Sequence, residues 1–213
     1  MTTWFTSDTH YWHTSIIRYC NRPFKDVEDM NKMLIENYKS KVKPEDTVYH
    51  LGDFSFCNQN RACEILEQLP GKKHWIVGNH DHKLVRQTEK YWTEITPYKL
   101  LMEHIKYEDD TGEPQQYYMP IVLFHFPILS WDGMVHGSWH LHGHCHGSLR
   151  DNGSLRLDIG VDCWDYVPVS LEEVQNEMAL RTVVPVDHHD RRENNPRFKH
   201  LLQIKKNEIS NTQ

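Results

Sequence analysis

The sequence predicts an α/β protein, and three observations support this fold class. Short apolar runs of strand length alternate with segments whose apolar residues recur at helical spacing. The 213 residues fit one domain, and 38% hydrophobic with 25% charged residues allows a sizeable core. Polar side chains follow directly after five of the apolar runs, at the sheet edge where α/β proteins bind their ligands.

The first half of the chain alternates strands and helices. We expect strands at Thr2–Ser7, Thr47–Leu51 and Lys73–Val77. A helix is expected over Asp26–Val42, because its apolar residues recur at helical spacing and Asp26 suits an N-cap. Further helices are expected at Asn60–Leu69, which Pro70-Gly71 terminates, and at His82–Thr88.

The second half is predicted to be richer in strands. A β-hairpin with a polar tip is predicted from two strand-like segments, Tyr98–Tyr107 and Gln115–Phe124. A loop is expected at Ile128–Gly137. Strands are expected at Ser138–Leu141 and Ser154–Val161, and a short helix with a capping box begins at Ser170. We place the domain at residues 1–185 and interpret residues 186–213 as a polar tail or edge element.

Composition excludes several classes of protein. No apolar run approaches the ~20 residues that span a bilayer, and the N-terminus has no secretory pattern, so we expect a cytoplasmic protein without membrane association. The five cysteines form no C-x-x-C pair, which indicates free thiols. A net charge of −6 argues against a broad basic face for nucleic acid but leaves room for bound cations. No feature indicates an obligate protein partner.

Oxygen and imidazole donors follow five predicted strands. They are Asp8 and His10, Asp53, Asn79 with His80, His125, and His144 with His146. Donors of this kind without thiolates suit Mn²⁺, Fe or Zn²⁺. Seven donors are too many for one tetrahedral site and suit two ions about 3.5–4 Å apart that share a carboxylate. The sequence therefore predicts a two-metal centre.

These motifs, in this order, resemble the signature of the calcineurin-like metallophosphoesterases. They read Asp8-Thr9-His10, Gly52-Asp53, Gly78-Asn79-His80-Asp81, a single His125, and Gly143-His144-Cys145-His146. The resemblance covers roughly Thr2 to Glu173 and looks closest to the small bacterial and phage-type phosphoesterases. It implies a four-layer α-β-β-α sandwich of two facing mixed sheets, with metals at the strand ends.

The resemblance also implies a role for each motif residue. One divalent ion would bind Asp8, His10 and His146, and the other Asn79, His125 and His144, with Asp53 as the bridge between them. Two Mn²⁺ ions are favoured, with Fe or Zn as alternatives. A hydroxide held between the cations would attack phosphorus in line. His80 would assist the leaving group as a general acid, with Asp81 behind it.

The substrate class remains open between two alternatives. The arginine that follows the second motif in serine/threonine protein phosphatases is absent from Gly52-Asp53-Phe54-Ser55-Phe56, which argues against protein dephosphorylation. We favour a phosphodiesterase or nuclease acting on single-stranded nucleic acid or a nucleotide; a phosphomonoesterase on a small substrate is the alternative. A catalytically silent scaffold of the same fold is a third hypothesis, although no motif residue is missing.

Several residues near the motifs have both a functional and a structural interpretation. His13 could reach substrate or lie on the surface, and Arg22 could clamp a phosphate or form a salt bridge. Trp164, in a cluster with Asp162, could stack on a base or cover the core. Four basic residues flank the third motif and could track a nucleic-acid backbone: Lys72, Lys73, Lys83 and Arg86.

Overall fold

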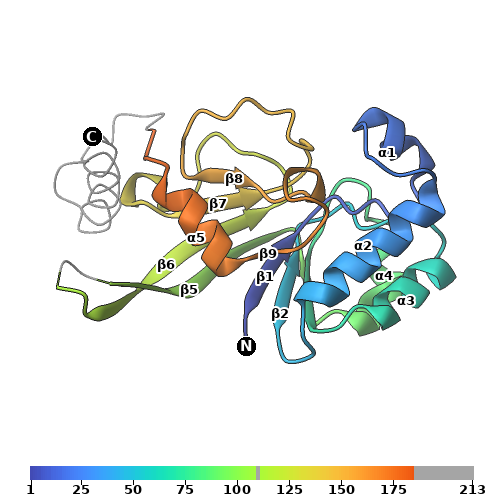
Figure 1. The fold of residues 1–213 in the computed structure, drawn as a ribbon, viewed down its shortest axis with the longest axis horizontal. Helices are drawn as coiled ribbons and strands as arrows, with labels where there is room; N and C mark the ends of the chain where they lie inside the picture. The colour runs from blue at the N-terminus through green and yellow to red at the C-terminus, as the bar shows by residue number, and fades with distance from the viewer. Residues whose placement is uncertain (109–110, 185–213) are drawn as a thin grey trace.

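The computed structural model describes residues 1–108 and 111–184, which form two β-sheets packed face to face with helices around them (Figure 1). Both sheets are mixed, so the expected α/β sandwich of two facing mixed sheets is present. The predicted tail or edge element at residues 186–213 lies outside the described residues.

The first sheet has the strand order β4-β3-β2-β1-β9. Four strands run parallel: β1 (Thr3–Thr6), β2 (Thr47–His50), β3 (Lys72–Ile76) and β4 (Glu94–Thr96). The short β9 (Val169–Ser170) pairs antiparallel with β1. Because β1, β2 and β3 are parallel neighbours, their carboxyl ends lie at one edge of this sheet.

The second sheet has the order β5-β6-β7-β8. The predicted hairpin is confirmed as β5 (Tyr98–Glu108) and β6 (Pro114–Phe124) in antiparallel register. Strands β7 (Trp139–His142) and β8 (Arg156–Asp158) continue parallel to β6. The carboxyl ends of β6 and β7 therefore also share one edge.

The structure has five α-helices within the described residues. They are α1 (Thr14–Tyr19), α2 (Val27–Lys41), α3 (Gln59–Gln68), α4 (Val85–Thr88) and α5 (Leu171–Ala179). Two of them, α2 and α5, begin at the predicted capping residues. The Asp26 side chain accepts a hydrogen bond from the Asp29 N–H at the start of α2, and Ser170 with Glu173 forms the expected capping box of α5. No helix in the described part of the chain has the length and apolar character needed to cross a bilayer.

Strand alternation divides the first sheet between two cores. Phe5 and Tyr49 point toward the second sheet, into a core that also holds Ile121, Leu123 and Trp139. The opposite face packs against α2 and α3 through a second core, which includes Val48, Trp75, Met30, Leu34 and Leu66. Val174 and Met178 of α5 join the core between the sheets. The sandwich is thus held by burial on both faces of the first sheet.

Several element boundaries differ from the sequence prediction. The edge strand β4 was not predicted, because its three residues are too few to show a period. The strand expected over Ser154–Val161 is confined to Arg156–Asp158, and a 3-10 turn runs from Val161 to Cys163. The helix expected at His82–Thr88 shortens to Val85–Thr88, because Leu84 N–H bonds back to Asp81 in a turn.

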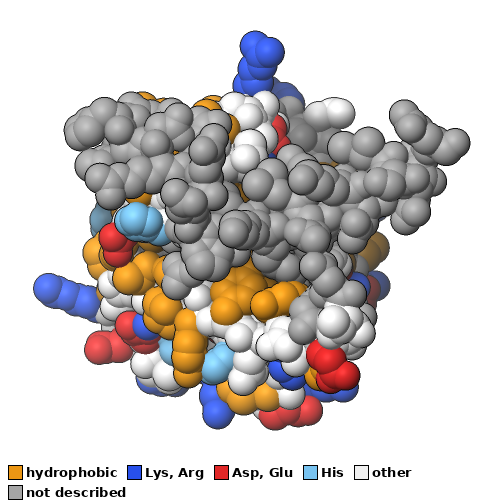
Figure 2. All heavy atoms as spheres, turned by 90° about the vertical axis from the view of Figure 1, so that its left-hand side faces the viewer, with side chains coloured by type: hydrophobic (Ala, Val, Ile, Leu, Met, Phe, Trp, Pro, Cys, Tyr) orange, Lys and Arg blue, Asp and Glu red, His pale blue; other side chains and the backbone are white. Residues whose placement is uncertain are grey.

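Hydrophobic side chains remain at the surface of the β5–β6 hairpin. Leu100, Met102 and Tyr118 are 41%, 48% and 55% exposed. Figure 2 shows hydrophobic side chains close together on the side of the molecule toward which the hairpin projects in Figure 1. They lie away from the strand ends that carry the polar motifs.

Candidate metal centre

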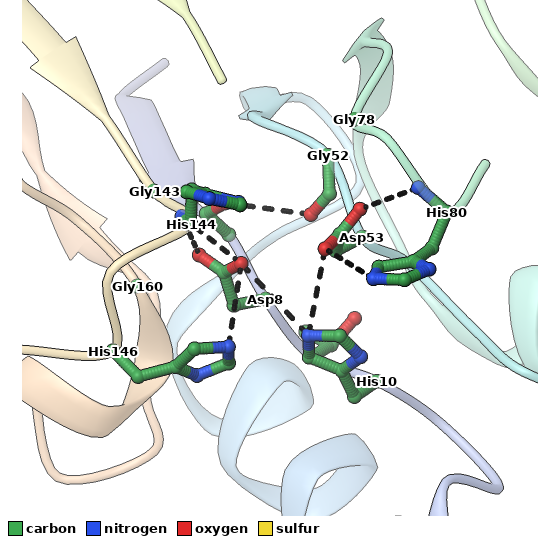
Figure 3. A network of polar contacts seen from close by, with 12 residues as sticks. Asp8, His10, Gly52, Asp53, Gly78, His80, Gly143, His144, His146 and Gly160 are labelled. Atoms are coloured by element: carbon green, nitrogen blue, oxygen red, sulfur yellow. Dashed lines mark hydrogen bonds and ion pairs between the residues drawn. The ribbon is translucent and has the colours of Figure 1, made fainter. Parts of the chain in front are cut away.

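The seven predicted ligands come from five different strand ends and meet in one place. They follow β1, β2 and β3 of the first sheet and β6 and β7 of the second, and they comprise Asp8, His10, Asp53, Asn79, His125, His144 and His146. Figure 3 labels five of them. Segments separated by up to 138 positions thus contribute to one cluster, which the convergence of parallel strand ends explains.

One group of donors contains Asp8, His10 and His146. The Nε2 atoms of His10 and His146 each lie 3.9 Å from Asp8 Oδ1. One donor atom from each residue lies within 4.8 Å of the other two, close enough for all three to hold one ion. This is the trio that the resemblance implies for the first metal.

A second group contains Asp53, His125 and His144, again with donor atoms within 4.8 Å of one another. Asn79 adds an amide oxygen, since its Oδ1 lies 3.0 Å from His125 Nε2. Carboxylate, imidazole and amide donors match the set implied for the second metal.

Asp53 lies between the two groups. Its Oδ2 atom is 3.7 Å from His10 Nε2 and 3.5 Å from His125 Nε2. A single carboxylate oxygen therefore faces one imidazole of each group, which is the position that a bridging ligand requires.

Hydrogen bonds fix the orientation of two of the imidazoles. His125 Nδ1 lies 2.7 Å from the Leu51 carbonyl oxygen, and His146 Nδ1 lies 2.6 Å from Asp162 Oδ2. These acceptors hold the proton on Nδ1, so each Nε2 presents its lone pair to the cluster. Sequence reasoning did not identify either partner's role, because a backbone carbonyl has no sequence signal and Asp162 lies in a separate segment.

Arg22 forms the salt bridge that was the alternative to a phosphate clamp. Its Nε and Nη2 donate to the two oxygens of Asp162, each at 2.8 Å, and its guanidinium also donates to the carbonyls of Asp8 and Thr9. The residue is 4% exposed. Because its guanidinium donors are directed at protein acceptors, Arg22 supports the backbone of Asp8 and Thr9 and the side chain of Asp162. The guanidinium is therefore not available to bind a phosphate in a bidentate manner.

The expected role of Asp81 behind His80 needs correction. The Asp81 carboxylate is fully buried and accepts hydrogen bonds from the backbone N–H groups of Asp53, Phe54 and Gly78, at 2.8, 2.9 and 2.7 Å. Trp75 Nε1 also donates to it, at 3.2 Å. Its recorded contacts do not include the His80 ring. Through these hydrogen bonds the Asp81 side chain links the backbone of the second motif, at Asp53, to that of the third motif, at Gly78.

His80 lies at the rim of the cluster. Its side chain is 48% exposed, and its Nε2 is 4.0 Å from Asp53 Oδ2. Its backbone N–H donates to Asp53 Oδ1 at 3.0 Å, which holds the Asp53 carboxylate from the other side (Figure 3). An exposed imidazole beside the metal-facing carboxylate can reach a bound substrate.

Phe56 and His13 form an aromatic surface next to His80. Their rings stack at 3.9 Å between centroids with 15° between planes, and Phe56 also lies 4.7 Å from the His80 ring. Phe56 is 41% exposed although it is a large apolar side chain. Its position, three residues after Asp53, was not singled out from the sequence.

The backbone turns sharply at the ligands themselves. Asp8, His10, Asp53, His144 and His146 all have positive φ, between 48° and 70°. Asp and His tolerate this left-handed region better than most residues, but it is still uncommon outside glycine. Its concentration at five of the seven predicted ligands indicates strain held for function.

Glycines allow the strand ends to approach one another. A Cβ at Gly52 would lie 2.6 Å from Gly78 Cα and 2.7 Å from His125 Nδ1, and a Cβ at Gly143 would overlap Ser7 Oγ and Asp8 Oδ2. Real Cβ atoms do not make such contacts, so the motifs converge only with glycine at these positions.

The electrostatics of the cluster favour cations. Burial raises the pKa of Asp8 to about 7, and burial lowers the pKa of His10 well below its usual value. Burial also acts to raise the pKa of Asp53, but the hydrogen bond and charge of His125 outweigh it and hold that pKa below its ordinary range. His10 Nε2 is buried without a hydrogen-bond partner. A divalent ion would both neutralise the carboxylates and satisfy this nitrogen, so the residues fit the metals that the motifs imply.

A third group of donors, Cys20, His146 and Asp162, is a poor metal site. Burial raises the pKa of the Cys20 thiol to about 11, so the thiolate that binds metals is scarce. Asp162 is already paired with Arg22 and His146. This group is better described as support for the first metal group.

Other residues considered from the sequence lie away from the cluster. Lys72 and Lys73 begin β3, whose opposite end carries the third motif, and Lys73 Nζ donates to the carbonyls of Leu69 and Gly71. They are therefore not placed to guide a nucleic acid to the cluster. Trp164 Nε1 donates to the Asp158 carbonyl, and its ring packs against the core between the sheets.

The comparisons with known proteins agree with the motifs. A family model described as calcineurin-like phosphoesterase matches residues 1–206. The uncharacterized protein MJ1445 of Methanocaldococcus jannaschii is 35% identical over 175 residues, covering 78% of this chain and 85% of that protein. The Gene 66 protein of Mycobacterium phage L5 is 29% identical over 199 residues, covering 81% of this chain and 91% of the phage protein.

One solved structure also matches closely enough to support the fold. The crystal structure of the protein of unknown function AQ665 from Aquifex aeolicus is 26% identical and has a TM-score of 0.55. The match covers 82% of this chain and 98% of that one. The similarity therefore extends over most of both chains.

Proposed function

We propose that this chain, which belongs to the calcineurin-like phosphoesterase family, is a phosphodiesterase acting on single-stranded nucleic acid or a nucleotide. The members of this family are metal-dependent phosphoester hydrolases. In this proposal the seven predicted ligands hold two divalent ions, with Mn²⁺ favoured and Fe or Zn as alternatives. When bound, such ions supply an activated water and neutralise phosphate oxygens.

The observation that carries the proposal is the position of Asp53. Its Oδ2 faces His10 Nε2 at 3.7 Å and His125 Nε2 at 3.5 Å, so one oxygen serves both donor groups. Packing alone does not require a carboxylate to sit between two imidazoles with a left-handed backbone. A shared ligand for two cations accounts for both features.

The chain's own residues prepare the site before substrate arrives. Leu51 and Asp162 fix the His125 and His146 rings, Asp81 fixes the loop that carries Asp53, and Arg22 fixes Asp162. Because the donors are preorganised, little reorganisation is needed when charge develops on the phosphate.

His80 is the candidate general acid. It is exposed at the rim and lies within reach of a group bound next to Asp53. A diester releases an alkoxide of high basicity, so a proton delivered from an imidazole to the leaving oxygen lowers the barrier. The backbone of a nucleic acid has such a leaving group, so this proton donor is compatible with a diester substrate.

The aromatic surface of Phe56 and His13 favours a substrate with a planar group. A 41% exposed phenylalanine beside the cluster offers an apolar face to a nucleobase. Stacking of a base on an aromatic ring is worth about 1–3 kcal/mol and depends little on sequence. This supports a nucleotide over a simple sugar phosphate.

The test is an activity panel with added Mn²⁺. It compares bis-p-nitrophenyl phosphate, p-nitrophenyl phosphate, single-stranded DNA, RNA and 2′,3′-cyclic nucleotides. We expect hydrolysis of diesters, lost in chelator and in Asp53→Asn. Hydrolysis of p-nitrophenyl phosphate alone would support the phosphomonoesterase. Wild-type protein that binds two ions and hydrolyses none of these compounds would support the scaffold.

A further inference from the structure

A cavity of about 310 Å³ lies beside the loop that carries His144 and His146, yet none of the seven predicted ligands lines it. Its walls come from β7, β8, the loop after His146, the turn at Cys163 and Trp164, and α5. The volume is at the small end of the range for ligand pockets, about 300–1,000 Å³. Neither His80 nor Phe56 contributes to its walls.

The charged groups around the cavity leave two guanidinium groups available. Asp151 is paired with Arg181 at 2.8 Å, and the Asp158 carboxylate accepts the N–H groups of Gly147 and Gly160. The two remaining arginines of the wall, Arg150 and Arg156, form no ion pair within residues 1–108 and 111–184. The wall also contains the acidic residue Glu177.

One buried polar group of the wall lacks a partner among the described residues. Arg181 Nε is buried without a hydrogen-bond partner, and the Arg181 side chain is only 11% exposed. His142, which also lines the cavity, is 2% exposed, and its Nδ1 lies 2.9 Å from the Gly143 carbonyl oxygen. Buried polar groups are normally satisfied, so unsatisfied ones at a cavity indicate a place for a polar ligand.

The cavity wall also contains aromatic and apolar residues. They are Leu149, Leu157 and Trp164, and the hydrogen bond from Trp164 Nε1 to the Asp158 carbonyl, at 2.9 Å, holds the indole in place. Guanidinium groups match the oxygens of a phosphate, and a fixed indole presents a flat surface to a planar group. We propose that this cavity is a second binding site, separate from the metal centre, for a nucleoside monophosphate unit.

The walls connect this site to the predicted metal ligands. Gly147, held by Asp158, directly follows His146, and His142 bonds to the carbonyl of Gly143 at the start of the same loop. Cys163 adjoins Asp162, which fixes the His146 ring. A ligand in the cavity therefore touches both segments that position His146.

The first test counts binding sites on the full-length, Mn²⁺-loaded protein by calorimetric titration with 5′-AMP. We expect two molecules per wild-type chain and one for Arg150→Gln/Arg156→Gln, with the remaining affinity unchanged. Arg61→Gln, which removes an exposed arginine on α3, should keep two. One molecule per wild-type chain that disappears in the double variant would still support the cavity and argue against AMP binding at the metal centre. Equal titrations for wild type and the double variant would overturn the proposal.

A folding control accompanies this count. Arg156 Nη1 donates to the Ile128 carbonyl, so the double variant is checked by thermal unfolding. If it is unstable, the single variant Arg150→Gln decides, because Arg150 is exposed and has no recorded hydrogen bond. A weakening of about tenfold or more is expected for the loss of one charged hydrogen bond to phosphate.

Steady-state kinetic measurements distinguish two possible ligands of the cavity, a free nucleotide and a nucleotide within a nucleic-acid strand. If the cavity holds part of the polymer, the double variant raises KM for a DNA oligonucleotide about tenfold or more and leaves KM for bis-p-nitrophenyl phosphate unchanged. If it holds free nucleotide, AMP alters kcat for bis-p-nitrophenyl phosphate in the wild type and not in the variant. The AMP count does not depend on hydrolysis, so wild-type protein with two sites and no diesterase activity would refute the proposed function alone.

Discussion

Replacing Asp81 with asparagine tests whether this carboxylate holds two motifs together or orients His80. In the structure one oxygen, Oδ2, accepts the N–H groups of Asp53 and Gly78 and the indole of Trp75, and Oδ1 accepts the N–H of Phe54. An asparagine can keep its oxygen on one side only. Its NH₂ group then faces at least one backbone N–H that has no other acceptor.

The expected cost follows from that single mismatch. A buried donor left without a partner costs about 1–3 kcal/mol. For a domain of this size, each kcal/mol lowers Tm by about 2–4 °C. We expect Asp81→Asn to unfold at lower temperature and lower urea concentration than the wild type, and to bind Mn²⁺ more weakly because the Asp53 loop is loosened.

The assay is urea and thermal unfolding followed by tryptophan fluorescence, in chelator and again in saturating Mn²⁺. His80→Ala is the matched control, because this exposed side chain should contribute little to stability. Unfolding of Asp81→Asn within 0.5 kcal/mol of the wild type, which is about the range for neutral surface changes, would refute the argument. Loss of turnover alone, as in His80→Ala, would restore the orienting role.

Four further predictions follow from the same geometry. His80→Ala should keep both Mn²⁺ ions but lose about 10²–10⁴-fold in turnover of a diester with a poor leaving group, and an unchanged rate would contradict the acid role. Asp162→Asn should weaken metal binding about 10–100-fold in an ion titration, whereas equal affinity would show that His146 needs no support. Phe56→Ala should raise KM for a dinucleotide about 5–150-fold while Phe56→Tyr does not, and equal KM values would exclude stacking. Burial and the neighbouring His142 lower the pKa of His140 to about 3, so below about pH 6.5 only the unfolded state takes up its proton. This group alone should lower stability by up to about 1.4 kcal/mol per pH unit down to about pH 3, and His140→Gln should reduce the slope in urea unfolding by that amount; an unchanged slope would contradict this contribution.

The motif residues were predictable because their chemistry is local. A strand followed at once by Asp8 and His10, or by His144 and His146, carries its donors in a few consecutive residues. The parallel order of strands then brings such ends to one edge of a sheet. Helix starts were predictable for a similar reason, since Asp26 and Ser170 bond to residues three positions ahead.

The roles of Asp81, Arg22 and Asp162 were not predictable in this way. Each is defined by a partner far along the chain: Asp81 by the N–H groups of Asp53 and Phe54, and Arg22 by Asp162, which is 140 residues away. The pattern around Asp81 suggested a histidine partner because the two are adjacent in sequence. In the fold the Asp81 carboxylate is buried and directed at the backbone.

Residue type and spacing were enough to identify the groups that can bind metal and to place them after strands, because they encode donor chemistry and local structure. The folded arrangement was needed to show that Asp53 faces both groups, that His125 and His146 present Nε2, and that a separate cavity adjoins the loop of His146. These features depend on distances between segments that meet only when the two sheets pack, and no local pattern specifies such distances.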